Sequence, residues 1–155
     1  MSKSNMPQKT KFSVAITTQT YQNLIHNTLG DSERAKRFIA TISSAVAVNP
    51  ALQECDAGTI LAGALLGERL NLSPSPQLGQ FYLVPFECKI KGPDGKTAWL
   101  KDENGNNIKD EKGKWVAATE MKAQFVLGYK GYIQLAIRSG FYKHINVLEV
   151  KEGEF

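Results

Sequence analysis

The spacing of apolar residues in the first half of the chain predicts three helices. Apolar positions recur at helical intervals in three stretches, which are Tyr21–Leu29, Phe38–Val46 and Ile60–Leu70. Residues suited to begin or end a helix stand beside them: Thr17 or Thr18 before the first stretch, Gly30 after it, Asp31 and Asn49-Pro50 around the second, and Asp56 before the third.

The third predicted helix is unusually rich in small residues. It contains Gly58, Ala62, Gly63, Ala64 and Gly67. Each interior glycine costs about 0.5–1 kcal/mol of helix stability relative to alanine. We therefore expect the small residues to let the helix backbone pack closely against a sheet or a neighbouring subunit.

After Pro76 the pattern changes from helical spacing to strand-like runs. The run Phe81–Phe86 reads as a strand that Pro85 interrupts or places at an edge. Residues 87–114 are polar, with turn signals at Asp94-Gly95, Asn104-Gly105 and Lys112-Gly113, and they predict a hairpin or meander arm. A strand pattern returns from Trp115 to Gly128, and a last apolar run, His144–Val150, predicts another strand.

The segment Gln124–Phe141 predicts a strand, a glycine-bracketed turn and a helix over about 131–139. Tyr129 and Lys130 lie between Gly128 and Gly131, so the turn displays an aromatic ring and a cation together. An ordinary connection with solvated side chains is the alternative. A phosphate-binding P-loop is a poorer interpretation, because its two glycines are spaced further apart than Gly128 and Gly131.

These elements predict an α+β fold, with N-terminal helices followed by an antiparallel β-sheet that carries a hairpin arm and a packed helix. Residues 1–12 read as a flexible basic arm and residues 13–155 as a single domain. The sequence pattern reveals no internal repeat.

Composition places the chain among soluble intracellular proteins. Its 155 residues are 42% hydrophobic and 22% charged, which is ordinary for one globular domain. Cys55 and Cys88 lack the spacing of a disulfide, zinc or redox motif. No apolar run reaches the ~18 residues of a membrane span, and the polar N-terminus does not resemble a secretory signal, so we expect a cytoplasmic protein.

Positive charge gathers toward the C-terminal end. The net charge is +4, and the segment Met121–Lys151 contains five cations (Lys122, Lys130, Arg138, Lys143 and Lys151) against Glu149 alone. A basic segment of this kind favours a polyanionic partner. Arg34, Lys36 and Arg37 form a second cluster near the start of a helix, for which a solvated face is the preferred interpretation.

Catalytic motifs are missing. His26 and His144 have no carboxylate or cysteine at ligand spacing, and the chain has no nucleophile elbow, zinc-protease or Walker signature. The acidic stretch 102–111 lacks the ordered ligands of a calcium loop. We expect no enzyme activity, no cofactor and no metal site. For Trp99 and Trp115, packing across the arm is preferred to base stacking.

Four segments resemble the RecT family of phage recombination proteins. They are Asn49–Asp56, Leu78–Phe86, Leu127–Gly140 and Val150–Phe155, and the resemblance covers about residues 34–155. It implies an ATP-independent DNA-binding recombinase that anneals complementary single strands in homologous recombination. It further implies a homo-oligomer, as a ring or helical filament, that works beside a partner exonuclease, and a core that looks like the β-β-β-α fold of single-strand annealing proteins.

The resemblance and the charge pattern indicate the same DNA-binding residues. Annealing must ignore sequence, so cations should hold phosphates and leave the base edges free to pair. The candidates for phosphate contact are Lys122, Lys130, Arg138 and Lys143, with backbone N–H groups near Gly128 and Gly131. Tyr129 and Tyr132 either contact sugar and bases or are buried. The family pattern favours arginine where Lys130 stands, so a single-point phosphate contact is expected there.

Members of the family usually continue about a hundred residues beyond the position of Phe155. We therefore expect the domain to be truncated at its C-terminal end. Such a chain should be less soluble and anneal more weakly than an extended version.

Overall fold

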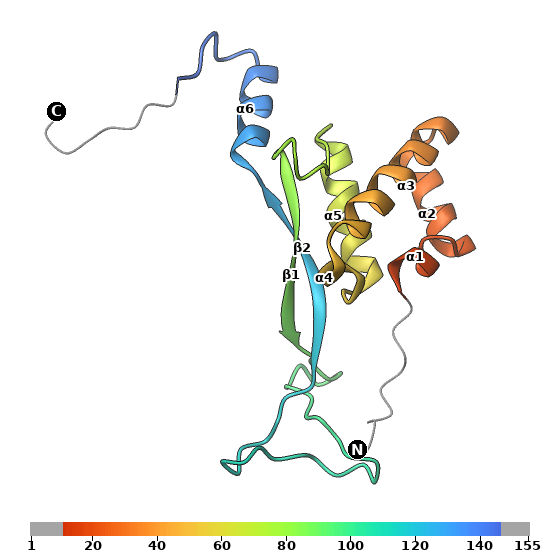
Figure 1. Cartoon of the computed structure of the whole chain (residues 1–155), viewed down its shortest axis with the longest axis vertical. Helices are drawn as coiled ribbons and strands as arrows, with labels where there is room; N and C mark the ends of the chain where they lie inside the picture. Colours follow the sequence, from red (N-terminus) through yellow and green to blue (C-terminus); the bar gives the residue numbers. More distant parts are fainter. Residues whose placement is uncertain (1–10, 147–155) are drawn as a thin grey trace, which may run out of the picture.

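The computed structural model describes residues 11–146, in which six helices and two strands form an α+β fold, as predicted (Figure 1). In chain order the elements are α1 (Phe12–Ala15), α2 (Gln19–Leu29), α3 (Ser32–Ala47), α4 (Pro50–Gln53), α5 (Ala57–Arg69), β1 (Phe81–Lys89), β2 (Thr119–Leu127) and α6 (Tyr129–Arg138). The helices α1 to α5 lie on one side of the two strands, and α6 lies at one end of them (Figure 1).

The three helices predicted from apolar spacing are α2, α3 and α5. The Asp31 carboxylate caps α3 by accepting hydrogen bonds from the Glu33 and Arg34 amides, both at 3.2 Å. Thr18 precedes α2 but makes no capping bond, because its hydroxyl donates to the Ala15 carbonyl instead. The four-residue helices α1 and α4 were not predicted, since one turn is too short to show a period.

Two of the small residues of α5, Gly63 and Gly67, face the sheet, as predicted. A Cβ at Gly63 would stand 2.7 Å from Leu83 Cδ2 of β1, and one at Gly67 would overlap the ring of Phe81. The Phe81 ring also packs on Phe125 of β2 at a centroid distance of 4.9 Å. The core therefore lies between α5 and one face of the sheet and extends to Ile25, Ile42 and other buried residues of the N-terminal helices.

The two strands pair antiparallel from Phe81↔Leu127 to Lys89↔Thr119, and β1 runs through Pro85 without a break. Pro85 is tolerated because it faces Ala123, whose N–H points away from β1 and donates to Thr59 Oγ1 at 2.9 Å. Directly opposed residues in an antiparallel pair exchange either both hydrogen bonds or neither. The missing N–H of Pro85 therefore costs the ladder nothing.

The face of the sheet that turns away from α5 is open, and its apolar side chains lie mainly on β1, opposite Gln124 and Lys122 of β2. Tyr82, Val84 and Phe86 of β1 alternate with the residues that face α5, and each is partly exposed. Val126 of β2 stands opposite Tyr82 and is exposed as well.

Between the strands, residues 90–118 form a hairpin arm beyond the end of the sheet that is remote from α6 (Figure 1). The structure reveals an internal repeat here: the segments 90–98, 100–108 and 108–116 each form a small hairpin with an apolar residue first, a lysine second and a glycine sixth. The second and eighth residues are bridged in all three, at Lys91↔Thr97, Lys101↔Asn107 and Lys109↔Trp115. The repeat was not predicted from the sequence because only four of its nine positions, the first, second, sixth and ninth, recur by residue type.

Backbone hydrogen bonds tie the three hairpins together in two closed triangles. Ala98 N–H donates to Ile90 O, Ala118 to Ala98 and Ile90 to Ala118, each at 2.8 Å. Leu100, Val116 and Ile108 form a second such cycle at 2.8–2.9 Å. The predicted arm is therefore confirmed, as a three-hairpin unit rather than a long ribbon.

The expected tryptophan core of this arm is wrong. The half-buried side chains are instead the aliphatic ones, including Ile90, Leu100 and Ile108. Trp99 and Trp115 remain 40% and 47% exposed.

Beyond α6 the described residues end at position 146. Of the strand predicted for His144–Val150, residues 144–146 have no regular structure and the remainder lies outside the described part. The basic arm predicted at 1–12 also lies mostly outside it, although Phe12 is buried as the first residue of α1. Within residues 11–146, none of the helices has the length and apolar character that crossing a membrane requires.

Candidate nucleic-acid interface

The corner between β2 and α6 has no separate turn, which corrects the sequence-based expectation. Gly128 is the N-cap of α6 in an extended conformation (φ −79°, ψ 160°), and Tyr129 and Lys130 already form the first helical turn. The glycines therefore do not serve a sharp turn. Their missing side chains instead let the backbone lie close to a neighbouring segment.

That segment is the loop 70–80, which joins α5 to β1. Gly128 N–H donates to the Gln80 carbonyl at 2.9 Å. Gly131 is buried, and a Cβ there would overlap the same carbonyl oxygen. Any larger residue at position 131 would push α6 off the loop. Gly131 thus positions the helix, and its backbone is covered rather than displayed.

Tyr129 and Lys130 are displayed at this helix start. The aliphatic stem of Lys130 passes over Gly79, where an added Cβ would lie 3.5 Å from Lys130 Cδ. The ammonium lies 5.9 Å from the centroid of the Tyr129 ring, which is 67% exposed. Because Lys130 makes no ion pair within residues 11–146, its charge is available to an anion.

At the other end of α6, Arg138 faces a groove. Its Nη1 donates to the Leu70 carbonyl at 2.9 Å, which anchors the side chain at the C-terminal end of α5. The groove has a volume of about 740 Å³. We call it the arginine groove; its lining residues are Arg34, Arg37, Phe38, Thr41, Ala64, Glu68, Asn71, Leu72, Ser73, Pro74, Gln80 and Arg138.

Three arginines from two distant helices thus surround one space. Arg34 donates from Nε to Glu68 at 2.7 Å, which holds its guanidinium in place and leaves its terminal nitrogens for another acceptor. Arg37 has no ion-pair or hydrogen-bond partner for its side chain among residues 11–146. With Glu68 as the one acidic side chain in the lining, the groove is net positive.

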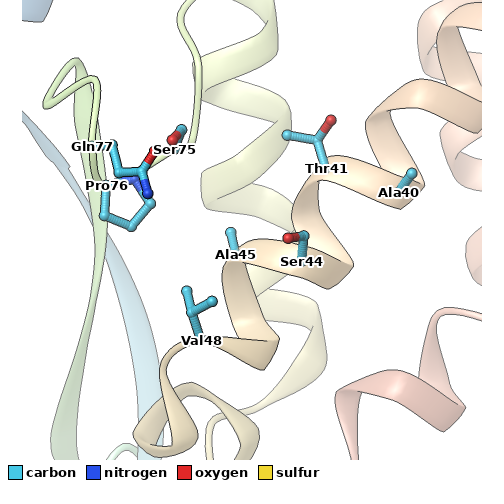
Figure 2. A pocket seen from close by; sticks show the side chains of 8 residues that line it. All are labelled: Ala40, Thr41, Ser44, Ala45, Val48, Ser75, Pro76 and Gln77. Atoms are coloured by element: carbon cyan, nitrogen blue, oxygen red, sulfur yellow. The ribbon is translucent and has the colours of Figure 1, made fainter.

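A second groove continues along α3 from the first, since both include Thr41. It has a volume of about 590 Å³ and is lined by Ala40, Thr41, Ser44, Ala45, Val48, Ser75, Pro76 and Gln77 (Figure 2). Figure 2 shows the small side chains of α3 opposite the 75–77 part of the loop. This neutral groove can admit an extended chain that also reaches the arginines.

Arg34 and Arg37 are exposed, as the preferred interpretation of a solvated face implies, but the sequence did not single them out as candidate site residues. Their spacing carried a usable signal, because positions 34, 37, 38 and 41 share one face of a helix and Phe38 on that face is buried. Lys36 points elsewhere and pairs with Glu33 at 3.1 Å. What the sequence did not show is that α6 delivers Arg138 to the same face.

The remaining candidates are spread out. Lys122 stands on β2, five residues or roughly 17 Å before its end. It donates to Glu120 at 2.9 Å, and this hydrogen bond and the Glu120 charge raise the pKa of Lys122 above its usual value. Lys143 is exposed in the segment after α6. Tyr132 is 62% exposed and borders a shallow pocket of about 410 Å³ with Tyr142.

Comparison with known proteins gives one family and two curated relatives. The model of the RecT family matches residues 36–155. The chain is 32% identical over 122 residues to the uncharacterized protein YqaK of Bacillus subtilis (strain 168), covering 79% of this chain and 31% of the relative. It is 28% identical over 120 residues to protein RecT of Escherichia coli (strain K12), covering 77% and 35% respectively. The chain thus spans about a third of the length of these relatives. No solved structure matches it.

Proposed function

The chain belongs to the RecT family, and from this premise we propose that it binds single-stranded DNA and anneals complementary strands without ATP. In this proposal the protein acts in recombination as a binding protein rather than an enzyme. Its cations hold the phosphate backbone and leave the bases free to meet a second strand.

The observation that carries the proposal is the convergence of Arg34, Arg37 and Arg138 on one groove. Guanidinium groups bind phosphate through paired N–H donors, and three of them around a single net-positive space suit a polyphosphate chain. Lys130 adds a point charge at the opposite end of α6. A strand that lies along α6 can therefore meet cations at both ends of the helix.

In this proposal the aromatic and remaining basic candidates make additional contacts to DNA or support the ones described above. Tyr129 and Tyr132 are exposed on α6 and can contact sugar or base faces. Lys122 and Lys143 extend the positive field. Gly131 contributes by keeping α6 against the Gln80 carbonyl.

We also propose that the protein forms a homo-oligomer, as a ring or helical filament, and works beside a partner exonuclease that exposes single strands. An oligomerisation module is the second candidate function. Four exposed apolar side chains on the open face of the sheet favour it, since such side chains gathered on one face commonly mark an interaction site; they are Tyr82, Val84, Phe86 and Val126.

Charge reversal tests the first proposal. Lys130→Glu, Arg37→Glu and Arg138→Glu should each weaken binding to every oligonucleotide sequence to a similar extent, because phosphates carry no sequence information. Each loss of a phosphate contact should flatten the slope of log affinity against log salt by about 0.7 for a single strand. The measurement is fluorescence anisotropy of labelled oligonucleotides at several salt concentrations.

Lys36→Glu is the matched control, because Lys36 lies on the same helix as Arg37 but outside the groove. Thermal melting identifies any variant that has lost its fold. Among the three variants, Arg37→Glu is expected to disturb the fold least, since the Arg37 side chain holds no partner within residues 11–146. If all three variants keep the affinity and the salt slope of Lys36→Glu, the arginine groove is not the DNA path. Annealing of complementary oligonucleotides in EDTA without ATP separates this function from a nuclease or nucleotide-using enzyme.

A further inference from the structure

The hairpin arm exposes two indole rings beside unpaired lysines at the end of the sheet that is remote from α6. Trp99 stands opposite Ala117 in an antiparallel bridge, so the small partner side chain leaves its ring uncovered. Trp115 is bridged to Lys109, whose ammonium lies 4.4 Å from the ring centroid. Since both rings are about half exposed, neither is needed to fill a core.

The repeat places its cations regularly. Lys91, Lys101 and Lys109 hold the second position of the three hairpins, and Lys96 and Lys114 hold the seventh position of the first and third. None of these lysines forms an ion pair within the described part of the chain.

The aspartates of the arm are occupied by the arm itself. Asp102 Oδ1 accepts from the Asn104 and Asn106 amides at 2.9 and 2.8 Å. Asp110 Oδ1 does the same for Lys112 and Lys114 at 2.9 and 2.8 Å. These carboxylates close their own turns, whereas the side chains of Lys91, Lys96, Lys101 and Lys114 are free to meet a ligand and that of Lys109 lies over Trp115.

We infer that the hairpin arm is a second contact for single-stranded DNA, in which unpaired bases stack on Trp99 and Trp115 while the repeat lysines meet phosphates. The inference rests on the proposed function and adds a separate site to it. Exposed aromatic rings interleaved with cations are the usual means of holding single strands without regard to sequence. A duplex offers phosphates but keeps its base faces stacked, so it fits the lysines and not the rings.

The geometry also sets a length. The nine paired residues of the sheet separate the arm from α6 by roughly 30 Å at about 3.3 Å per residue. At the duplex rise of about 3.4 Å per nucleotide, roughly nine nucleotides span this distance, and a more extended single strand spans it with fewer.

The test uses the two tryptophans of the chain as reporters, since both lie in the arm. The intact protein is titrated with an oligothymidylate of about 20 nucleotides, and tryptophan emission is recorded together with anisotropy of a labelled copy in parallel samples. We expect emission to fall in step with the anisotropy rise, and acrylamide to quench the bound protein less than the free one. Trp99→Phe and Trp115→Phe leave one reporter each, and both should still respond.

Substitution then measures the contribution of the rings. Trp99→Ala should weaken binding about tenfold and Trp99→Phe clearly less, because a phenyl ring still stacks. Ala117→Ser, on the opposed residue of the same bridge, is the matched control and should leave affinity unchanged. Hydrogen exchange of the arm in each variant shows whether the hairpins persist.

The outcomes distinguish the two proposals. Binding by anisotropy with unchanged emission and unchanged acrylamide quenching overturns the arm contact and leaves the proposed function standing. Equal quenching by a duplex or by polyphosphate overturns base stacking, since neither offers unpaired base faces. Absence of binding by anisotropy overturns both proposals.

Discussion

At the scale of single residues, Gly63 decides how closely α5 lies on the sheet. Gly63→Leu introduces a side chain where even a Cβ would stand 2.7 Å from Leu83 Cδ2 and 3.6 Å from Phe125 Cβ. We expect a loss of about 1–3 kcal/mol in the free energy of unfolding, because overpacking a buried contact displaces its neighbours. Denaturant unfolding measures it.

Ala62→Leu is the control for that substitution. It adds the same side chain one residue earlier on the same helix, where Ala62 is exposed. The control should change the stability by no more than about 0.5 kcal/mol. Equal stability of the two variants would mean that α5 does not pack on the sheet through its small residues.

Residue-scale features were predictable where their cause is local. Asp31 and Asp56 cap α3 and α5 because a carboxylate before a helix finds free N–H groups whatever the rest of the chain does. Arg37 is the opposite case. Its place in the arginine groove depends on α6 and the loop 70–80, which lie far away in sequence, so its neighbours in sequence show only a charged helix start.

At the scale of elements, the start of α5 is fastened to β2 by two hydrogen bonds. Asp56 N–H donates to the Met121 carbonyl at 2.8 Å, and Ala123 N–H donates to Thr59 Oγ1 at 2.9 Å. Thr59→Val keeps the side-chain shape but removes the acceptor, which leaves a buried amide without a partner. We expect a loss of about 1–3 kcal/mol in stability, measured by denaturant unfolding.

Thr41→Val provides the comparison for this effect. The Thr41 hydroxyl donates to the Arg37 carbonyl at 2.8 Å, as the Thr59 hydroxyl donates to the Asp56 carbonyl, but it accepts nothing from another element within residues 11–146. Removing the Thr41 hydroxyl should therefore lower the free energy of unfolding much less than removing the Thr59 hydroxyl. If Thr59→Val and Thr41→Val unfold at the same denaturant concentration, the bond from Ala123 contributes nothing to holding α5 on β2.

The elements themselves were mostly visible in the sequence, and their boundaries less so. Helix α6 begins at Tyr129 rather than after Gly131 because Gly128 and Gly131 allow contact with Gln80 instead of forming a turn. Strand β1 continues through Pro85 because the opposed Ala123 directs its N–H to Thr59. Both outcomes depend on a partner segment, which apolar spacing within one segment does not report.

At the scale of the whole molecule, the chain divides into a body with a continuous core and an arm with little buried surface. The body core runs from Phe12 to Ala123 and includes α5 and both strands. The arm relies on its two hydrogen-bond triangles and on turns closed by aspartate side chains. Segments with few buried apolar contacts open with lower free energy than a packed core does.

Hydrogen exchange followed by mass spectrometry should therefore show two levels of protection, with the amides of the arm exchanging faster than those of α5 and β2. Asp102→Ala removes the acceptor for the Asn104 and Asn106 amides, so it should speed exchange in the arm and leave α5 unchanged. Thr59→Val should do the reverse, since it weakens the joint between α5 and β2. Faster exchange throughout α5 in Asp102→Ala would show that body and arm open as one unit. The arm could then not be altered without the body, and its proposed role as an independent contact for single strands would lose its structural basis.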